Sequence, residues 1–239
     1  MPDPLIYQTE RLVPAQTPWY QTQLIRDHLA RYHFAANLVR GGLVVDAACG
    51  SGYGSALLAA KAKTVIGFDL DPAIIHYAQK QSPLLPNLTF KVADVTHLPL
   101  PPASVDLLVS LETIEHLHDQ SAFIKSVRRC LKPRGLFILS TINPLVTGRS
   151  NPYHQHELTQ TDLSQLLKTF SQVTFYGQKP FPKAYLNRIL PLIHRIPAGR
   201  WHWLADTVLK LPFRGTGVTP LATYSSRLTP AFFLIVGRR

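Results

Sequence analysis

The stretch DAACGSGYGS, residues 46–55, follows a short apolar run and precedes a helical pattern. Its three glycines lie at every second position, Gly50, Gly52 and Gly54. Glycine lets a backbone turn sharply and lets a ligand approach it closely. A strand, a glycine-rich turn and a helix in this order are typical of nucleotide-binding α/β folds. The glycines alone do not distinguish one adenosine-containing ligand from another.

Apolar strands and amphipathic helices alternate along the chain on both sides of this turn. The predicted strands are residues 43–48, 64–71, 88–95, 105–112, 136–143, 173–178 and 231–238. The predicted helices are residues 22–40, 55–63, 72–81, 120–132 and 159–170. This alternation predicts an α/β fold of the Rossmann-like, doubly wound kind, with a mostly parallel seven-stranded sheet covered on both faces.

The length of 239 residues suits a single domain. We divide it into an N-terminal helical cap at 1–42, a cofactor-binding core at 43–178, a basic and apolar insertion at 179–229 and a last strand at 230–239. The two cysteines form no disulfide framework, and the sequence has neither a secretory pattern nor a long apolar run. We therefore expect a cytoplasmic protein.

The net charge of +11 is concentrated near the C-terminus, because residues 178–239 hold ten Lys and Arg but one acid. Such a local field favours an anionic partner. Residues 179–229 also carry two tryptophans and many aliphatic side chains. They are interpreted as an acceptor lid or as a peripheral contact with the inner face of a membrane, the alternative being short helices packed on the sheet edge. Nucleic acid is disfavoured, because the arginines are scattered among prolines and aliphatics.

Acidic residues stand at three predicted strand ends, around the glycine-rich turn. Asp46 lies in the turn itself, where it would repel a diphosphate but attract an amine or a hydroxyl. Asp69 is suited to accept hydrogen bonds from ribose hydroxyls, and Asp94 from an adenine amino group. Because ligands bind at the carboxyl ends of parallel strands, we expect the three acids to surround one adenosine-containing ligand. A nicotinamide dehydrogenase is disfavoured, because Asp46 opposes the pyrophosphate of its cofactor.

Five segments together resemble the class I S-adenosylmethionine-dependent methyltransferases over nearly the whole chain. They are VVDAACGSGYGS (44–55), GFDLD (67–71), VADV (92–95), VDLLVSLETIEHL (105–117) and RRCLKPRGLFILSTIN (128–143). The resemblance implies S-adenosylmethionine as cofactor. It assigns the methionine part to the glycine-rich turn, the ribose to the second strand end and the adenine to the third. The implied cofactor residues are Asp46, Ala48, Gly50, Gly52, Asp69, Leu70, Asp94, Val95 and Leu111.

Two positions depart from the family pattern. Ala48 stands where many members have glycine, and Arg134 replaces the first glycine of a usual pair. The chain is more narrowly similar to a bacterial group found near glycan and cell-surface biosynthesis, in which an N-terminal helix covers the cofactor. This implies O-methylation of a glycan, a lipid-linked sugar or another lipid-associated small molecule. By the same likeness His28, Arg31 and Tyr32 either approach the cofactor or pack in the core.

The segment ETIEHLH, residues 112–118, follows the fourth predicted strand, where the methyl group would lie. A helical turn here predicts Glu112, Glu115 and His116 on one face, as catalytic residues. Methyl transfer to a hydroxyl needs a base, and His116 suits that role near neutral pH. Asn143, after the fifth strand, either orients the acceptor or forms a turn.

A divalent metal is the alternative interpretation of the same segment. The small-RNA terminal 2′-O-methyltransferases have a similar Glu-x-x-Glu-His and a later histidine that bind a metal, and the ubiquinone-pathway O-methyltransferases resemble them. The corresponding ligands here are Glu112, Glu115, His116 and His154. A third interpretation has Glu112 closing the cofactor pocket while the others cap and pack the next helix. An inactive S-adenosylmethionine-binding protein is the remaining hypothesis, and the sequence predicts no oligomeric state.

Overall fold

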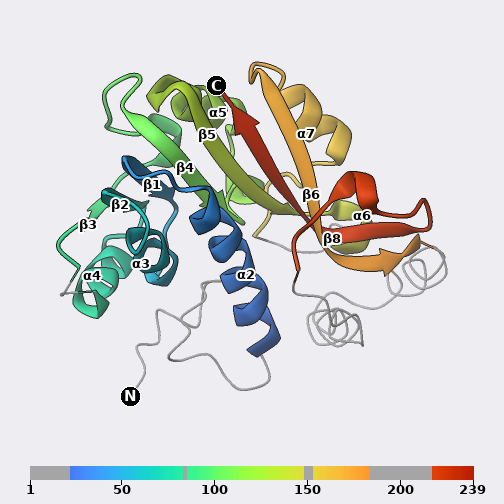
Figure 1. The fold of residues 1–239 in the computed structure, drawn as a ribbon, viewed down its shortest axis with the longest axis horizontal. Helices are drawn as coiled ribbons and strands as arrows, with labels where there is room; N and C mark the ends of the chain where they lie inside the picture. The colour runs from blue at the N-terminus through green and yellow to red at the C-terminus, as the bar shows by residue number, and fades with distance from the viewer. Residues whose placement is uncertain (1–21, 83–84, 148–152, 184–216) are drawn as a thin grey trace.

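The computed structural model describes residues 22–82, 85–147, 153–183 and 217–239, and its centre is one twisted sheet (Figure 1). The strands are β1 (Leu43–Ala47), β2 (Thr64–Asp69), β3 (Leu88–Val92), β4 (Val105–Leu111), β5 (Leu131–Ile142), β6 (Gln172–Pro182), β7 (Thr219–Pro220) and β8 (Leu228–Arg238). Their order is β3-β2-β1-β4-β5-β8-β6-β7. The first five strands are parallel, and β8 is antiparallel to both of its neighbours.

Helices cover both faces of the sheet, as the sequence predicts for a doubly wound fold. The helices are α2 (Thr22–Leu38), α3 (Tyr53–Ala59), α4 (Pro72–Gln81), α5 (Gln120–Cys130), α6 (Pro144–Thr147) and α7 (Gln160–Leu166), with 3₁₀ turns η3 (Val95–His97), η4 (Ile114–His116) and η5 (Leu221–Thr223). Side chains of α2 and α3 share one apolar core with the sheet, and those of α5 and α7 share the other. The predicted fold class is confirmed.

Local sequence explains where several helices begin. The Asp71 carboxylate accepts a hydrogen bond from the Ala73 amide at 2.8 Å, and Pro72 occupies the first helical position of α4. Asp119 caps α5 in the same way, and Thr159 and Asp162 form a reciprocal capping box at the start of α7. These caps fix the helix starts that follow the carboxyl ends of the strands.

The described sheet departs from the prediction in its strand count and at some boundaries. It has eight strands instead of seven, because residues 219–220 pair with β6 at the edge. β5 begins at Leu131, since that residue pairs with Val105 before a shift in register, so the helix before it ends at Cys130. β6 continues to Pro182, which moves residues 179–182 from the predicted insertion into the sheet.

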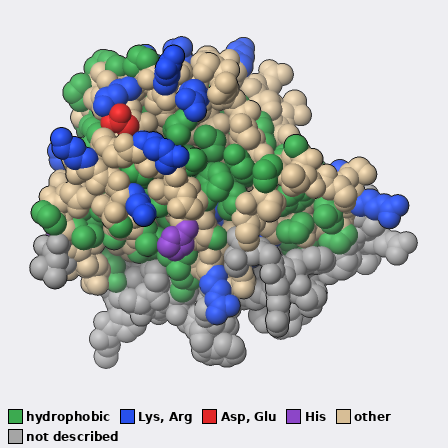
Figure 2. Space-filling model, viewed as in Figure 1, with side chains coloured by type: hydrophobic (Ala, Val, Ile, Leu, Met, Phe, Trp, Pro, Cys, Tyr) green, Lys and Arg blue, Asp and Glu red, His purple; other side chains and the backbone are tan. Residues whose placement is uncertain are grey.

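Most of the predicted insertion, residues 184–216, lies outside the described residues. Among the helices that are described, none is both long and apolar enough to cross a membrane. Figure 2 shows Lys and Arg side chains gathered over the upper part of the molecule, where Figure 1 draws the C-terminus. Arg239 there exchanges backbone hydrogen bonds with residues 134–135 near the start of β5, so this is the amino edge of the parallel strands.

The parallel strands end together at the opposite edge. The chain proceeds outward from β1 to β2 and β3, and then returns to place β4 on the other side of β1. The carboxyl ends of the neighbouring strands β1 and β4 are therefore the switch point of the sheet, where folds of this kind bind ligands. The glycine-rich turn follows β1 and ETIEHLH follows β4, so both predicted motifs meet at this place.

Candidate active site

The three glycines of the turn have different surroundings. Gly50 has φ +53°, and a Cβ built on it would have no atom within 4 Å, so this glycine borders open space. A Cβ on Gly52 would lie 2.6 Å from the ring of Phe90, and a Cβ on Gly54 would overlap the ring of Tyr32. Gly50 is thus the glycine that lets a ligand approach, whereas Gly52 and Gly54 make room for neighbouring aromatic rings.

The Asp69 carboxylate is held beside Gly50 at the end of β2. It accepts hydrogen bonds from the Gly50 amide at 3.0 Å and from the Asp71 amide at 3.1 Å. Two backbone donors fix the orientation of the carboxylate and leave it further lone pairs for hydroxyl donors. Ala48 has φ +66°, a left-handed conformation that glycine adopts more readily than alanine.

The residues predicted to surround the adenine lie at the ends of β2 and β3. Asp94 is exposed and accepts hydrogen bonds from Thr96 through its amide and its hydroxyl, which lower the pKa of the carboxyl. Leu70 is 69% exposed directly after β2, so its side chain is accessible to a ligand at this edge. Val95 and Leu111 are buried and support the site from below.

Asp46 is fully buried, whereas Asp69 is 8% exposed and Asp94 lies at the surface. Its carboxyl accepts hydrogen bonds from the Ser55 hydroxyl at 2.6 Å and from the Tyr32 hydroxyl at 3.2 Å. Burial raises the pKa of Asp46 to about 7, although both hydroxyls oppose the shift. Within the described residues Asp46 therefore joins α2 and α3 to β1, and its contact with the methionine part stays a prediction.

Helix α2 contributes a buried polar cluster to the same edge. Arg31, which is fully buried, donates to the Glu112 carboxylate and to Gln178 Oε1. His28 Nε2 lies 2.8 Å from Glu112 Oε1, and the Tyr53 hydroxyl lies 2.8 Å from His28 Nδ1. Burial and then the Arg31 charge lower the pKa of His28 well below its ordinary value, so a neutral ring donates from Nε2 and accepts at Nδ1.

The prediction that Glu112, Glu115 and His116 share one helical face is wrong. Glu112 has φ +49°, and the helical turn η4 begins after it, at Ile114. The left-handed backbone turns Glu112 toward Arg31 and His28, whereas Glu115 and His116 face the loop after α6. The four predicted metal ligands are thus divided, because Glu112 takes no part in the cluster of the other three.

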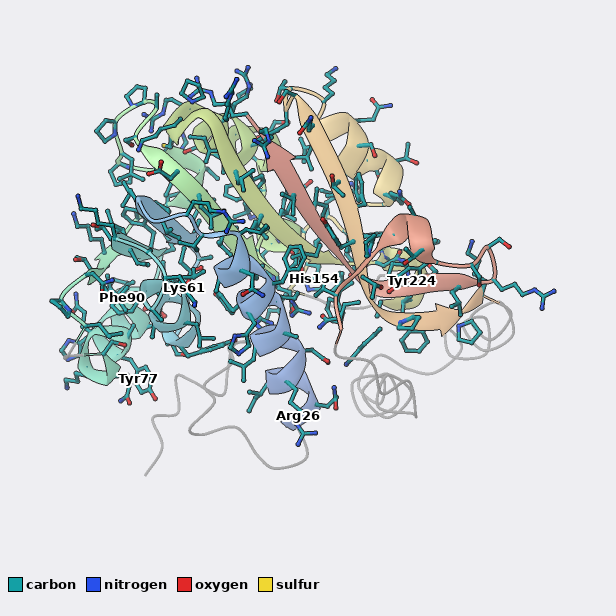
Figure 3. All side chains as sticks on the ribbon, viewed as in Figure 1. Arg26, Lys61, Tyr77, Phe90, His154 and Tyr224 are labelled. Atoms are coloured by element: carbon teal, nitrogen blue, oxygen red, sulfur yellow. The ribbon has the colours of Figure 1, made fainter. Side chains whose placement is uncertain are left out.

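That cluster joins Glu115 and His116 to His154, with one ligand atom of each within 4.8 Å of the others. The rings of His116 and His154 meet edge to face, with centroids 4.8 Å apart. The Glu115 carbonyl accepts a hydrogen bond from the Gln155 amide at 2.8 Å, which holds this loop against η4. Figure 3 shows His154 below the central strands, on the side where their carboxyl ends lie.

Both imidazoles are oriented through Nδ1. The Nδ1 of His116 lies 3.1 Å from the Tyr153 carbonyl, and the Nδ1 of His154 lies 2.7 Å from Glu157 Oε1. A carbonyl and a carboxylate can only accept, so each Nδ1 carries a proton, and Nε2 is the basic nitrogen when the ring is neutral. Glu157 was not predicted, because a spacing of three residues indicates a contact only within a helix, and His154 and Glu157 lie in a loop.

Glu115 is 1% exposed, and neither of its carboxyl oxygens makes a well-formed hydrogen bond with the described residues. Burial raises its pKa to about 7, while His154 and the Thr141 hydroxyl lie close enough to oppose this. A carboxyl with a pKa of about 7 beside two imidazoles can act as a general base, and the same donor atoms suit a divalent cation.

Asn143 has the turn role that the sequence left as one of two options. Its side-chain amide donates to the Thr229 hydroxyl at 3.0 Å and the Pro230 carbonyl at 2.8 Å, and its side-chain oxygen accepts from the Leu145 amide. The residue is 1% exposed. These bonds join the end of β5 to the start of β8 and use both polar atoms of the side chain.

The comparisons with known proteins agree with this geometry. A family model described as "Methyltransferase domain" matches residues 45–139. The chain is 36% identical over 177 residues to a Mycolicibacterium smegmatis protein named "probable S-adenosylmethionine-dependent methyltransferase", covering 71% of the chain and 66% of that protein. It is 29% identical over 154 residues to a Yersinia pestis malonyl-[acyl-carrier protein] O-methyltransferase, covering 64% and 48%.

Further similarities concern the core and the fold. Over 106 residues the chain is 35% identical to an Arabidopsis thaliana phosphoethanolamine N-methyltransferase, covering 44% of the chain and 22% of that protein. The chain thus spans two thirds or less of these relatives' lengths. The solved structure of Bacillus subtilis YcgJ has a TM-score of 0.60 at 18% identity, covering 90% of this chain and 98% of that one, a likeness that concerns the fold alone.

Proposed function

Because the chain carries a class I S-adenosylmethionine-dependent methyltransferase domain, we propose that it transfers a methyl group to an oxygen atom of its acceptor. The observation that carries the choice of oxygen is the pair of oriented histidines beside buried Glu115. An oxygen acceptor must lose its proton, and this cluster supplies basic nitrogens at the carboxyl end of β4. The relatives do not decide the question, because their names include both O- and N-methyltransferases.

The described residues fit S-adenosylmethionine. The open space at Gly50 accepts a ligand in contact with backbone, and Asp69 beside it offers oriented oxygens to two hydroxyls. Asp94 and exposed Leu70 offer an acceptor and an apolar face to an adenine. When bound, the cofactor supplies a methyl group on a positively charged sulfur, which needs no further activation by the protein.

The protein's residues then align the acceptor and take up its proton. Because the Nδ1 of His116 faces the Tyr153 carbonyl, Nε2 is the ring nitrogen that would take up the hydroxyl proton. Glu157 holds His154 in the matching tautomer, so the second ring supports the same transfer. Glu115, with a pKa of about 7, gives the cluster one more group that binds a proton near neutral pH.

For the acceptor we propose a glycan, a lipid-linked sugar or another lipid-associated small molecule. Two large apolar side chains stand exposed on the segments that flank the cluster, Leu145 at 59% and Tyr153 at 54%. An acceptor with both hydroxyls and an apolar part would cover them. A lipid-linked acceptor also agrees with the predicted peripheral contact at the inner face of a membrane through residues 179–229, which belongs to the same proposal.

Metal-assisted O-methylation is the second candidate, favoured by one observation. Glu115, His116 and His154 bring three ligand atoms within 4.8 Å, and Tyr153 and Glu157 orient the two rings as partners of metal-bound histidines do. Full activity of the chelator-treated, metal-free protein would exclude this candidate. Restoration by Mg²⁺, Mn²⁺ or Zn²⁺ after complete loss would establish it over the metal-free base.

Turnover with methyl-labelled S-adenosylmethionine tests the proposal directly. The purified protein is incubated with sets of glycan, lipid-linked sugar, quinone-precursor, RNA and amine acceptors, and the labelled product is identified by mass spectrometry. We expect label on an oxygen of the first two sets. Label on nitrogen would contradict the choice of oxygen, and cofactor binding without transfer to any set would favour the hypothesis of an inactive binding protein.

A further inference from the structure

Two non-glycine residues take left-handed conformations on either side of the switch point. Ala48 (φ +66°) follows β1, and Glu112 (φ +49°) follows β4. Non-glycine residues rarely adopt this backbone conformation, because it is strained. Where a folded protein has it, the surrounding contacts must stabilise it. Alanine carries no group that explains its own position, but Glu112 carries a carboxylate, 22% exposed, at the point where the fold binds its ligand.

Helix α2 holds this carboxylate from one side. His28 Nε2 and a nitrogen of the Arg31 guanidinium both donate to the same oxygen, Glu112 Oε1. Arg31 itself is fixed at its other end, because it donates to Gln178 and lies 4.7 Å from the centroid of the Phe232 ring. The two donors from α2 thus fix the orientation of the Glu112 carboxylate.

The donors to Glu112 also connect it with the glycine-rich turn. Tyr53, the first residue of α3, donates its hydroxyl proton to His28 Nδ1 over 2.8 Å, and the same ring donates to Glu112. This chain of hydrogen bonds spans the switch point from the residue after Gly52 to the residue after β4. Any ligand seated on Gly50 therefore lies between elements that α2 joins together.

The two acids at this edge, Asp46 and Glu112, differ in how well they can receive a cationic ligand. The cofactor is cationic at its methionine end, where it carries an ammonium group and the sulfonium. Asp46, the acid predicted to meet that end, is fully buried, accepts from Ser55 and Tyr32 and is therefore poorly suited to receive another donor. Glu112 is partly exposed, and two donors hold it in place.

We propose that Glu112 binds the ammonium group of the cofactor's methionine part, and that Arg31 and His28 are positioning residues that hold Glu112 for this contact. The inference rests on the proposed function. Glu112 then binds the cofactor and takes no part in the chemistry of methyl transfer. Helix α2 then supports this ligand contact in addition to covering the site.

Calorimetric titration of Glu112→Gln with three ligands tests the contact without any acceptor. S-adenosylmethionine and S-adenosylhomocysteine both carry the ammonium group, whereas 5′-methylthioadenosine lacks the amino-acid end. A charge-assisted hydrogen bond is worth roughly tenfold or more in affinity, so we expect about that loss for the first two ligands and little change for the third. Asp119→Asn, which removes an exposed helix-capping charge but keeps the cap, is the matched control.

Three results would overturn the assignment. Equal weakening of all three ligands would indicate a distorted site, unchanged affinity would exclude the contact, and a loss confined to S-adenosylmethionine would assign Glu112 to the sulfonium instead. A wild-type protein that fails to bind S-adenosylmethionine would contradict the proposed function itself. Wild-type binding with unaltered Glu112→Gln binding would contradict only this inference.

The positioning role is tested at His28, since fully buried Arg31 is a risk for folding when replaced. We expect His28→Leu to weaken S-adenosylmethionine and S-adenosylhomocysteine several-fold and to leave 5′-methylthioadenosine unchanged. His28→Gln, whose amide retains a donor, is expected to recover most of that loss. If His28→Leu binds as the wild type does, or if His28→Gln recovers nothing, His28 does not position Glu112.

Discussion

Tyr32 on α2 packs so closely against Gly54 on α3 that a Cβ at residue 54 would overlap the tyrosine ring. The hydroxyl of the same tyrosine donates a hydrogen bond to the Asp46 carboxyl at 3.2 Å. The third glycine of the turn therefore fixes the position of the helix that covers the site. Gly54 therefore influences the site through the position of α2, whereas Gly50 does so by letting a ligand contact its backbone.

The first prediction follows from this packing. Gly54→Ala has no room for its methyl group, so α2 must shift, and we expect a loss of about 1–3 kcal/mol in the free energy of unfolding. Gly50→Ala has open space for its methyl group, and strain at φ +53° should cost about 1 kcal/mol, with a larger loss of cofactor affinity. Denaturant unfolding and calorimetric titration of both variants measure the two effects. A stable Gly54→Ala would show that the contact is not rigid.

The buried carboxyl of Asp46 predicts a pH dependence of stability. Its pKa rises from an ordinary 3.8 to about 7 in the folded chain, so the folded state binds more protons between these values. The stability contributed by this group is complete below about pH 4 and is lost as the pH rises through 7. Since each pKa unit corresponds to about 1.4 kcal/mol, Asp46→Asn should change the slope of stability against pH by at most about 1.4 kcal/mol per pH unit, a few kcal/mol over the whole interval.

Unfolding of the wild type and Asp46→Asn at several pH values checks this sign. The difference in unfolding free energy, wild type minus variant, should fall between pH 4 and pH 7 and then level off. A difference that rises over the same interval would mean that Asp46 is ionised in the folded protein, as a carboxylate in direct contact with a cation would be.

His116→Ala should lose turnover by about 10²–10⁴-fold and keep cofactor affinity, because the variant removes the base and leaves the glycine-rich turn intact. His118, two residues further on, is exposed, and His118→Ala is the matched control that should retain activity. Initial rates with a saturating acceptor and calorimetry with S-adenosylmethionine separate the two quantities. Unchanged turnover in His116→Ala would exclude it as the base.

Glu157→Gln tests the second ring. The amide that replaces Glu157 supports the His154 tautomer less well than a carboxylate does, so turnover should fall by about 10–100-fold while cofactor affinity is retained. Glu157→Asp keeps the charge and should recover part of the rate. Equal rates in the wild type and in Glu157→Gln would limit the chemistry to His116 and Glu115.

The sequence predicts the strands and the ligand edge well because both depend on local patterns. Apolar runs such as 105–111 are buried on both faces, and acids such as Asp69 follow strands whose ends must meet in a parallel sheet. The extra length of β5 was not predictable in this way, because Leu131 joins the sheet only through a shift in register opposite Val105.

The sequence indicated which residues belong to the site better than it indicated how their side chains are arranged. Glu112 reads as part of a helical turn, and only the tertiary contacts with Arg31 and His28 explain its left-handed backbone. A fully buried arginine goes against the usual preference of that residue, so the sequence could not choose between its packing and ligand roles. Glu157 was missed because its partner lies three residues away in a loop without regular structure.

One titration tests the central claim most directly, namely that the edge between β1 and β4 binds S-adenosylmethionine. The purified chain is titrated in a calorimeter with S-adenosylmethionine and, separately, with NADH. We expect saturable one-site binding of S-adenosylmethionine with a dissociation constant in the range of about 1 μM to 1 mM usual for enzyme ligands, and no binding of NADH. Binding of NADH without binding of S-adenosylmethionine would contradict the claim.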